Sequence, residues 1–231
     1  MSLGAETMWI TPEEWQIMGF TLVVCTLSTI AILPFGLGIA WLLARRRWRG
    51  KTLVEAIVTV PLVIPPVATG LILLKLFGRR GFVGGFFHER LGLDVVFTWR
   101  AVVIAAAVMS FPLLVRSARV GFETVDQTFE DVARTFGAGT LRIFFSITLP
   151  LASRAVAAGI VLAFARAVGE FGATILVAGN IPGKTTTISL KIYEAVQLGH
   201  DAVAYRLVVV CLLLSFAAVW ISERLSRSRA E

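Results

Sequence analysis

Residues 178–185, AGNIPGKT, have the types and spacing of a nucleotide-binding loop in its relaxed form: Ala or Gly, four residues, then Gly-Lys-Thr. In a working loop of this kind, backbone N–H groups and the lysine hold nucleotide phosphates, while the hydroxyl residue binds Mg²⁺. Lys184 and Thr185 would take those two roles here.

The surrounding residues argue against this chemistry. A nucleotide-binding loop follows a strand, whereas the preceding FGATILVAG is typical of the end of an apolar helix. Pro182 also removes an N–H donor where the phosphates would need one. We therefore interpret the stretch as a Gly-Pro turn with a surface lysine.

The cysteines and histidines indicate no metal chemistry. Cys25 and Cys211 lie in separate apolar runs, and His88 and His200 stand alone in polar connections. Since none of them has the spacing of a ligand set, we expect no metal and no cofactor in this chain.

The composition instead indicates an integral membrane protein. Of the 231 residues, 57% are hydrophobic and 16% charged, whereas about a quarter of the residues of a soluble domain are charged. The net charge of +7 is explained by basic loops that flank membrane spans. We expect a lipid bilayer, and no nucleic acid, as partner.

A bilayer core requires about 20 apolar helical residues, and we predict an all-α domain over residues 1–231 with about five such spans. The spans are 16–43, 53–77, 97–115, 152–179 and 204–222. Residues 185–199 are too short and polar to cross, and they predict a short outer helix that lies at the surface or dips part-way in.

The basic residues set the orientation. Segment 45–51, RRRWRGK, has five basic residues and no acid, which predicts a cytoplasmic loop. The N-terminus is then outside and the C-terminus cytoplasmic, and residues 123–150 form a cytoplasmic loop. The N-terminus has no Lys or Arg before its apolar run, so we expect the first span to be retained.

The 123–150 loop has an internal pattern. Residues 131–136 favour a helix, Gly137 and Gly139 interrupt it, and 140–147 favour a second short helix before Pro150. From spacing alone, this pattern fits an ordinary loop as well as a rigid docking surface.

At this loop the chain resembles the ABC-importer permeases, which carry Glu-Ala-Ala, three residues, Gly, nine residues and Ile-x-Leu-Pro. The matching positions are Ala133, Gly137, Ile147, Leu149 and Pro150. Asp131 stands at the Glu position and Val132 at the first Ala position, which keeps the charge and the apolar character.

Further motifs resemble the molybdate-transporter permease group over nearly the whole chain. They are LPFG (33–36), VPLVIPP (60–66), GRRGFVG (78–84), MSFPLLVRSAR (109–119), LAFARAVGEFGAT (162–174) and GNIPGKTTT (179–187). Sulfate and tungstate permeases share parts of these motifs, so both anions stay open as alternatives.

The resemblance implies a type I ABC importer permease fold in a bacterial inner membrane. A homodimer of this chain would join two cytoplasmic ABC ATPase subunits, which carry ATP and Mg²⁺, and an extracytoplasmic molybdate-binding protein. The chain itself would be no enzyme. It would move molybdate by alternating access.

The implied coupling residues lie in the cytoplasmic loop. We expect Phe136 or Leu141 to fill a groove on the ATPase and Arg134 or Arg142 to add charged contacts, around a hinge at 137–139. The predicted coupling set is Asp131, Ala133, Arg134, Phe136, Gly137, Leu141 and Arg142.

Arg166 and Glu170 are four residues apart and share one helix face. Ionisable residues at membrane depth mark functional sites or neutralise each other, and we interpret this pair as a structural ion pair beside a gate. The predicted gate and pathway residues are Pro65, Pro66, Gly169, Glu170, Phe171, Gly172 and Thr174.

Five helix-breaking prolines also lie inside the apolar runs: Pro34, Pro61, Pro65, Pro66 and Pro112. At 63–66, VIPP fits a packed kink as well as a pathway lining. A stand-alone secondary transporter would explain the broken helices but not the 123–150 loop.

Overall fold

The computed structural model describes residues 10–46 and 48–227, and within these ranges it contains helices and no strand. The elements are α1 (Pro12–Arg45), α2 (Lys51–Val63), α3 (Pro66–Phe77), α4 (Phe82–Leu91), α5 (Trp99–Glu123), α6 (Gln127–Thr135), α7 (Thr140–Ile143), the π-helix η1 (Phe144–Thr148), α8 (Leu149–Val168), α9 (Gly172–Val177), α10 (Ile188–Gln197) and α11 (Asp201–Arg227). The all-α prediction is confirmed.

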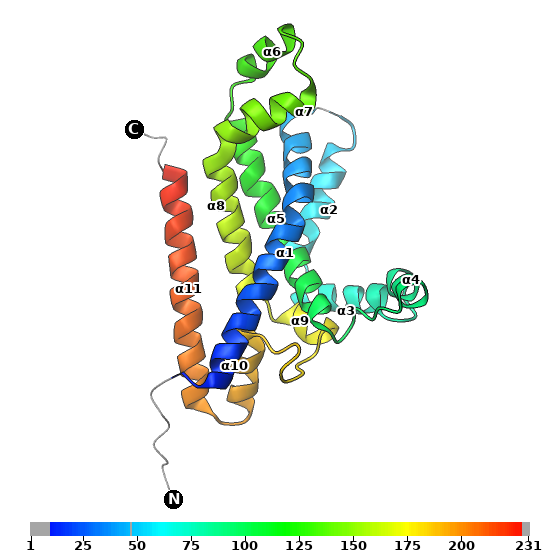
Figure 1. The fold of residues 1–231 in the computed structure, drawn as a ribbon, viewed down its shortest axis with the longest axis vertical. Coiled ribbons are helices and arrows are strands. Elements are labelled where there is room, and N and C mark those ends of the chain that lie inside the picture. The colour runs from blue at the N-terminus through cyan, green and yellow to red at the C-terminus, as the bar shows by residue number, and fades with distance from the viewer. Residues whose placement is uncertain (1–9, 47, 228–231) are drawn as a thin grey trace, which may run out of the picture.

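Long apolar helices form the body of the molecule. Among the described residues, four helices are long and apolar enough to cross a membrane, or five if the bent pair α2–α3 counts as one span. In Figure 1, α1, α5, α8 and α11 run along the long axis, with α6 at one end and α10 at the other. We call these the α6 end and the α10 end.

Small residues bring these helices close together. α5 lies between α1 and α8, and α11 packs on α8. A Cβ added to Gly121 would lie 2.6 Å from the Cβ of Ala155, and one added to Gly159 would lie 2.8 Å from the Cβ of Ser117. Glycine and alanine at these crossings let backbones approach, as is common between membrane helices.

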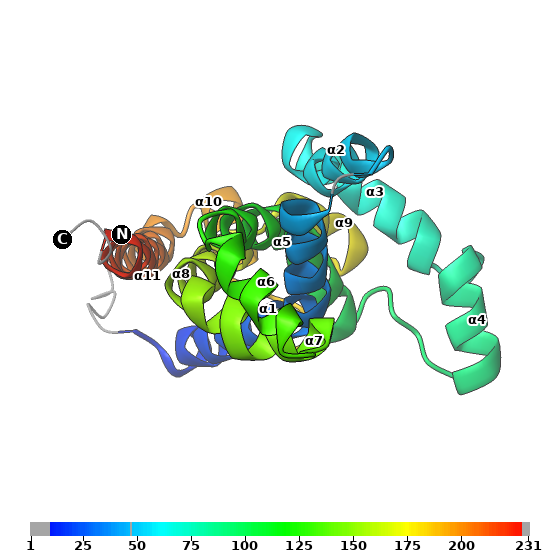
Figure 2. The same ribbon diagram turned by 90° about the horizontal axis from the view of Figure 1, so that it is seen from above.

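The predicted span 53–77 forms two helices, bent by 110° at a short break. Ile64 and Pro65 are extended, with ψ angles of 151° and 133°, because a residue that precedes proline avoids the helical region. From this break α3 leads away from the bundle to α4, as Figures 1 and 2 show. Pro34, Pro61 and Pro112, in contrast, lie inside continuous helices.

The other predicted segments differ mainly at their ends. The helix of the 97–115 prediction continues to Glu123, and that of 152–179 ends at Val168, before a break and the short α9. α4 lies in the connection 78–96 between two predicted spans, for which no helix was predicted. The outer helix is α10, whose Ile188 and Leu190 are buried and which packs on α11 and α1.

Candidate coupling site and helix break

Local polar contacts fix both ends of α6. The Asp126 carboxylate accepts a hydrogen bond from the backbone N–H of Thr128 at 2.9 Å, which lowers the pKa of Asp126. At the other end, Gly137 has a φ of +80°. Its N–H donates to the Arg134 carbonyl, and the Ala138 N–H donates to the Ala133 carbonyl. A left-handed glycine after the last turn is a common helix stop.

The expected hinge at 137–139 depends on one of its two glycines. Gly139 has a φ of −71° and a ψ of 159°, an extended backbone open to any residue, and it precedes α7. Because only Gly137 has a positive φ, the requirement for glycine falls on that position.

Apolar side chains project from the region that joins α6 to α7. Phe136 is 86% exposed and Leu141 75% exposed. A groove of about 300 Å³ is lined by Ala133, Phe136 and Arg142, together with residues of the following helix. The structure thus gathers most of the predicted coupling residues on one exposed surface, on α6, α7 and the turn between them.

The two charged α6 residues of the predicted coupling set contact each other. An Arg134 guanidinium nitrogen lies 2.5 Å from an Asp131 carboxylate oxygen, and both side chains are exposed. Their charges are therefore already paired within this chain.

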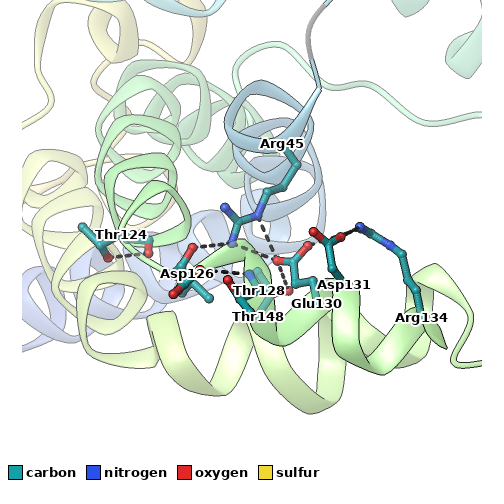
Figure 3. A network of polar contacts seen from close by, with 10 residues as sticks. Arg45, Thr124, Asp126, Thr128, Glu130, Asp131, Arg134 and Thr148 are labelled. Atoms are coloured by element: carbon teal, nitrogen blue, oxygen red, sulfur yellow. Dashed lines mark hydrogen bonds and ion pairs between the residues drawn. The ribbon is translucent and has the colours of Figure 1, made fainter. Parts of the chain in front are cut away.

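Glu130 is a buried residue of this region that the sequence interpretation did not single out. Its side chain is 2% exposed and pairs with Arg45, the last residue of α1, at 2.8 Å. The Thr148 hydroxyl donates to the same carboxylate oxygen at 2.8 Å. Arg45 also donates to the Val125 carbonyl at 3.0 Å. In Figure 3, Arg45 and Thr148 both point toward Glu130; the three residues come from α1, the end of η1 and α6, respectively.

The sequence gives little sign of this cluster, which we call the Glu130 clamp (Arg45, Glu130 and Thr148). Glu130 is one acid in a polar loop, and Arg45 is 85 positions away from it. Arg45 also belongs to the basic run 45–51, and basic residues are expected in a cytoplasmic loop, so nothing in the sequence sets Arg45 apart.

A second buried carboxylate lies at the break between α8 and α9. One oxygen of Glu170 lies 2.8 Å from Arg166, and the other accepts the Ala173 N–H at 2.8 Å. The Glu170 side chain is 2% exposed. The carboxylate therefore pairs with α8 and caps the start of α9, which explains why the helix ends earlier than predicted.

This break touches the break between α2 and α3. A Cβ added to Gly172 would lie 2.7 Å from the Cβ of Pro66, and one added to Gly70 would lie 2.9 Å from the Ala173 backbone. The close contact of α3 with α9 therefore depends on glycine.

The remaining predicted gate residues surround this contact without converging on one point. Pro65 and Gly169 are exposed, and Thr174 is buried. Phe171 packs its ring on Tyr193 of α10, with ring centroids 4.9 Å apart. The ring thus connects the break to the α10 end.

The segment 178–185, whose pattern is that of a nucleotide-binding loop, contains the predicted turn. Residues 182–185 form a turn that follows α9, not a strand, and Lys184 is exposed. The Thr185 hydroxyl donates to the Gly179 carbonyl and accepts the Ile181 N–H, so it serves the loop itself. No cluster of three or more His, Cys, Asp or Glu side chains that could hold a metal occurs within the described residues.

A family comparison gives the class of this fold. The family model described as "Binding-protein-dependent transport system inner membrane component" matches residues 32–231. The chain belongs to this family, whose members are transport permease subunits of the inner membrane.

The chain is also similar to individual curated proteins. The chain is 47% identical to the Molybdenum transport system permease protein ModB of Escherichia coli (strain K12), over 96% of this chain and 99% of the relative. It is 42% identical to the ModB protein of Haemophilus influenzae, over 93% and 94% of the two chains. The Sulfate transport system permease protein CysT of Salmonella typhimurium is 36% identical, over 90% and 76%.

Solved structures share the fold at low sequence identity. The MetNI methionine ABC transporter in an inward-facing conformation matches with a TM-score of 0.67 at 16% identity, over 94% of both chains. A bacterial alginate ABC transporter matches with a TM-score of 0.69 at 18% identity, over 94% of this chain and 79% of that one. The fold is that of a type I ABC importer permease.

Proposed function

We propose that this chain is the permease subunit of an ATP-driven importer that moves molybdate across the bacterial inner membrane. The observation that carries the proposal is the 47% identity to a molybdenum permease over 96% of the chain. The exposed Phe136 and Leu141 beside α6 agree with it, since a permease of this class needs a surface for a motor subunit.

The proposed assembly has two copies of this chain, two cytoplasmic ABC ATPase subunits that bind ATP and Mg²⁺, and a molybdate-binding protein outside. The α6 end then faces the cytoplasm, because Arg45 and Arg46, which begin the basic run, lie beside α6. The N-terminus is outside and the C-terminus cytoplasmic. No ATP hydrolysis is assigned to this chain.

In this proposal the α6–α7 surface couples the ATPase to the pathway. Phe136 and Leu141 enter a groove on the ATPase, and Arg142 contacts its rim.

Asp131 and Arg134 can exchange their mutual ion pair for contacts across the interface. Ala133 lines the groove beside Phe136, and Gly137, with its positive φ, ends α6. Two arrangements of the attached helices, which ATP favours unequally, are what alternating access requires.

The paired helix breaks are the proposed gate. Pro65 lies in one break and Gly169, Glu170 and Phe171 lie in the other, while Pro66 begins α3 and Gly172 and Thr174 lie in the first turn of α9. Non-helical backbone at membrane depth is tolerated where it is buried in protein or lines a wet cavity. The Arg166–Glu170 pair holds one side of this gate in place.

Uptake of labelled molybdate tests the proposal in cells that lack the chain, with and without its restoration and with excess sulfate present. Restored uptake that sulfate does not suppress is the expected result. Suppression by sulfate would keep the importer but reassign its anion, which the 36% identity to a sulfate permease makes a concrete alternative. Excess tungstate serves as a second competitor, and suppression by tungstate alone would extend the assignment to that anion. Uptake in the absence of any ATPase would indicate a stand-alone transporter instead.

A further inference from the structure

α6 is attached to the rest of the chain in an unusual way. Among its nine residues, all of which the structure describes, Glu130 is the only one that is buried. The two large apolar side chains of this helix, Phe129 and Val132, are more than half exposed, and the small Ala133 is half-buried. α6 packs mainly on its immediate neighbours α7 and η1. A carboxylate therefore takes the place that apolar side chains normally hold when a helix docks on a bundle.

The carboxylate joins segments that are distant in sequence. Arg45 reaches one Glu130 oxygen through both Nε, at 2.9 Å, and Nη2, at 2.8 Å. Thr148 donates to the same oxygen, and its side chain is fully buried. Arg134 lies 3.5 Å from the other oxygen. Charge-assisted hydrogen bonds of this kind are short and directional, so they fix the position of α6 as well as hold it.

The two partners that share one Glu130 oxygen, Arg45 and Thr148, lie at the ends of long helices. Arg45 ends α1, which extends over 34 residues to the α10 end, and Thr148 directly precedes α8, which extends to the break at Gly169. Both helices pack on α5. A displacement of α6 would therefore pass through one side chain into two helices that cross the molecule.

We propose that the Glu130 clamp is the mechanical link between the ATPase surface and the pathway, so that α6 and the ends of α1 and α8 move as one body. This inference rests on the proposed function and adds to it a positioning residue that does not touch the ATPase. The exposed Phe136 and Leu141 bind the partner, while Glu130 transmits the partner's movement.

The test compares Glu130→Ala with Glu123→Ala in the full complex of permease, ATPase and molybdate-binding protein. Glu123 is a matched control, because it also pairs with an arginine, Arg119, at the α6 end but is exposed. For Glu130→Ala we expect the ATPase to stay bound and to hydrolyse ATP. Stimulation of hydrolysis by the loaded binding protein, and molybdate uptake, should both fall about tenfold, within the usual range of coupling between sites. Glu123→Ala should match the wild type.

A distance measurement separates transmission from a merely structural role. Spin labels are placed at Thr135 on α6 and Arg46 after α1, both exposed, with Cys25 and Cys211 replaced by alanine. In the otherwise unchanged complex the distance distribution should stay narrow and constant on addition of ATP. In Glu130→Ala it should broaden and shift with ATP. If the alanine variant does not accumulate, Glu130→Gln and Thr148→Val, which keep the volume, carry the same test with smaller effects.

The possible failures are distinct. If the unmodified complex takes up no molybdate, the proposed function fails. If it transports and the Glu130 variants match Glu123→Ala, the clamp proposal fails alone. Loss of the ATPase from the Glu130 variants would also overturn it, because Glu130 would then serve docking and not transmission.

Discussion

Two of the three buried carboxylates among the described residues make a useful comparison; the third, Glu14, pairs with Arg206 near the start of α1. Glu130 and Glu170 each have side chains 2% exposed, and each forms an ion pair with arginine. Glu170 finds its partners within four residues, at Arg166 and at the Ala173 N–H. Glu130 finds its two closest partners 85 and 18 positions away, and its local partner Arg134 is more distant, at 3.5 Å. Glu170 therefore shapes one local turn of chain, whereas Glu130 joins separate elements.

The difference bears on what each carboxylate does to stability. Glu170 caps α9, which packs closely on α3. Loss of the Glu170 side chain should therefore lower the stability of the bundle. α6 has no other buried residue, and a cavity of about 250 Å³ beside the clamp is lined by Arg45, Glu130 and Gln127. Loss of Glu130 should therefore release α6 and leave the bundle folded.

The largest effect on stability is expected from Glu170→Ala. It leaves Arg166 without its partner and the start of α9 without its cap. Breaking a buried ion pair typically costs about 3–5 kcal/mol; because Arg166 is 26% exposed, the lower end of this range is expected. Thermal unfolding of the purified complex in detergent measures it. An unchanged Tm, or a fall as large for Glu130→Ala, would refute the contrast between the two carboxylates.

The next effect concerns the contact of the two helix breaks. Gly172→Ala places a methyl group 2.7 Å from the Cβ of Pro66, whereas in Gly169→Ala the nearest atom is 3.9 Å away. Overpacking of a close contact costs about 1–3 kcal/mol. Gly172→Ala should thus lower the Tm and slow molybdate uptake. Because Gly169 belongs to the proposed gate, Gly169→Ala is the matched control for the Tm alone, and an equal fall of the Tm in the two variants would show that the stability of the breaks does not depend on this contact.

At the α6 end, Gly137→Asp should leave the protein in the membrane but dissociate or uncouple the ATPase. The left-handed conformation costs a residue other than glycine about 1–2 kcal/mol, and Gly137 has a φ of +80°. Gly139→Asp adds the same charge at a φ of −71° and should bind the ATPase normally. Co-purification of the ATPase measures both. Loss in both variants would assign the effect to charge and not to the end of α6.

An exposed pair supplies the smallest effect and tests the role of burial. Asp94 pairs with Arg79 at 2.6 Å on the surface, and hydrogen bonding to Arg79 lowers the pKa of Asp94 below its usual 3.8. A lowered carboxyl pKa stabilises the fold above pH 3.8, and that contribution disappears as the pH falls through the lower folded pKa. Surface pairs contribute little, so Asp94→Asn should leave the Tm nearly unchanged at pH 7. A large decrease of the Tm at pH 7 would show that an exposed carboxylate can stabilise the fold as much as the buried Glu170.

Most features set by residues close in sequence could be predicted, whereas features set by contacts between distant residues could not. The apolar stretches predicted the long helices, and the i,i+4 spacing predicted the contact of Arg166 with Glu170. The double proline at 65–66 indicated an interruption, but not its 110° bend, which depends on the packing of Gly172 against Pro66. The end of α8 was missed because a buried carboxylate, and not loss of apolar character, stops the helix. Glu130 was missed because its partner Arg45 comes close only in the fold.

The most direct test of the account is import of labelled molybdate into proteoliposomes that contain the permease with its ATPase. We expect uptake that requires ATP on the ATPase side and the molybdate-binding protein on the opposite side, and that excess sulfate does not suppress. Uptake by the permease alone, with neither ATPase nor ATP present, would contradict it.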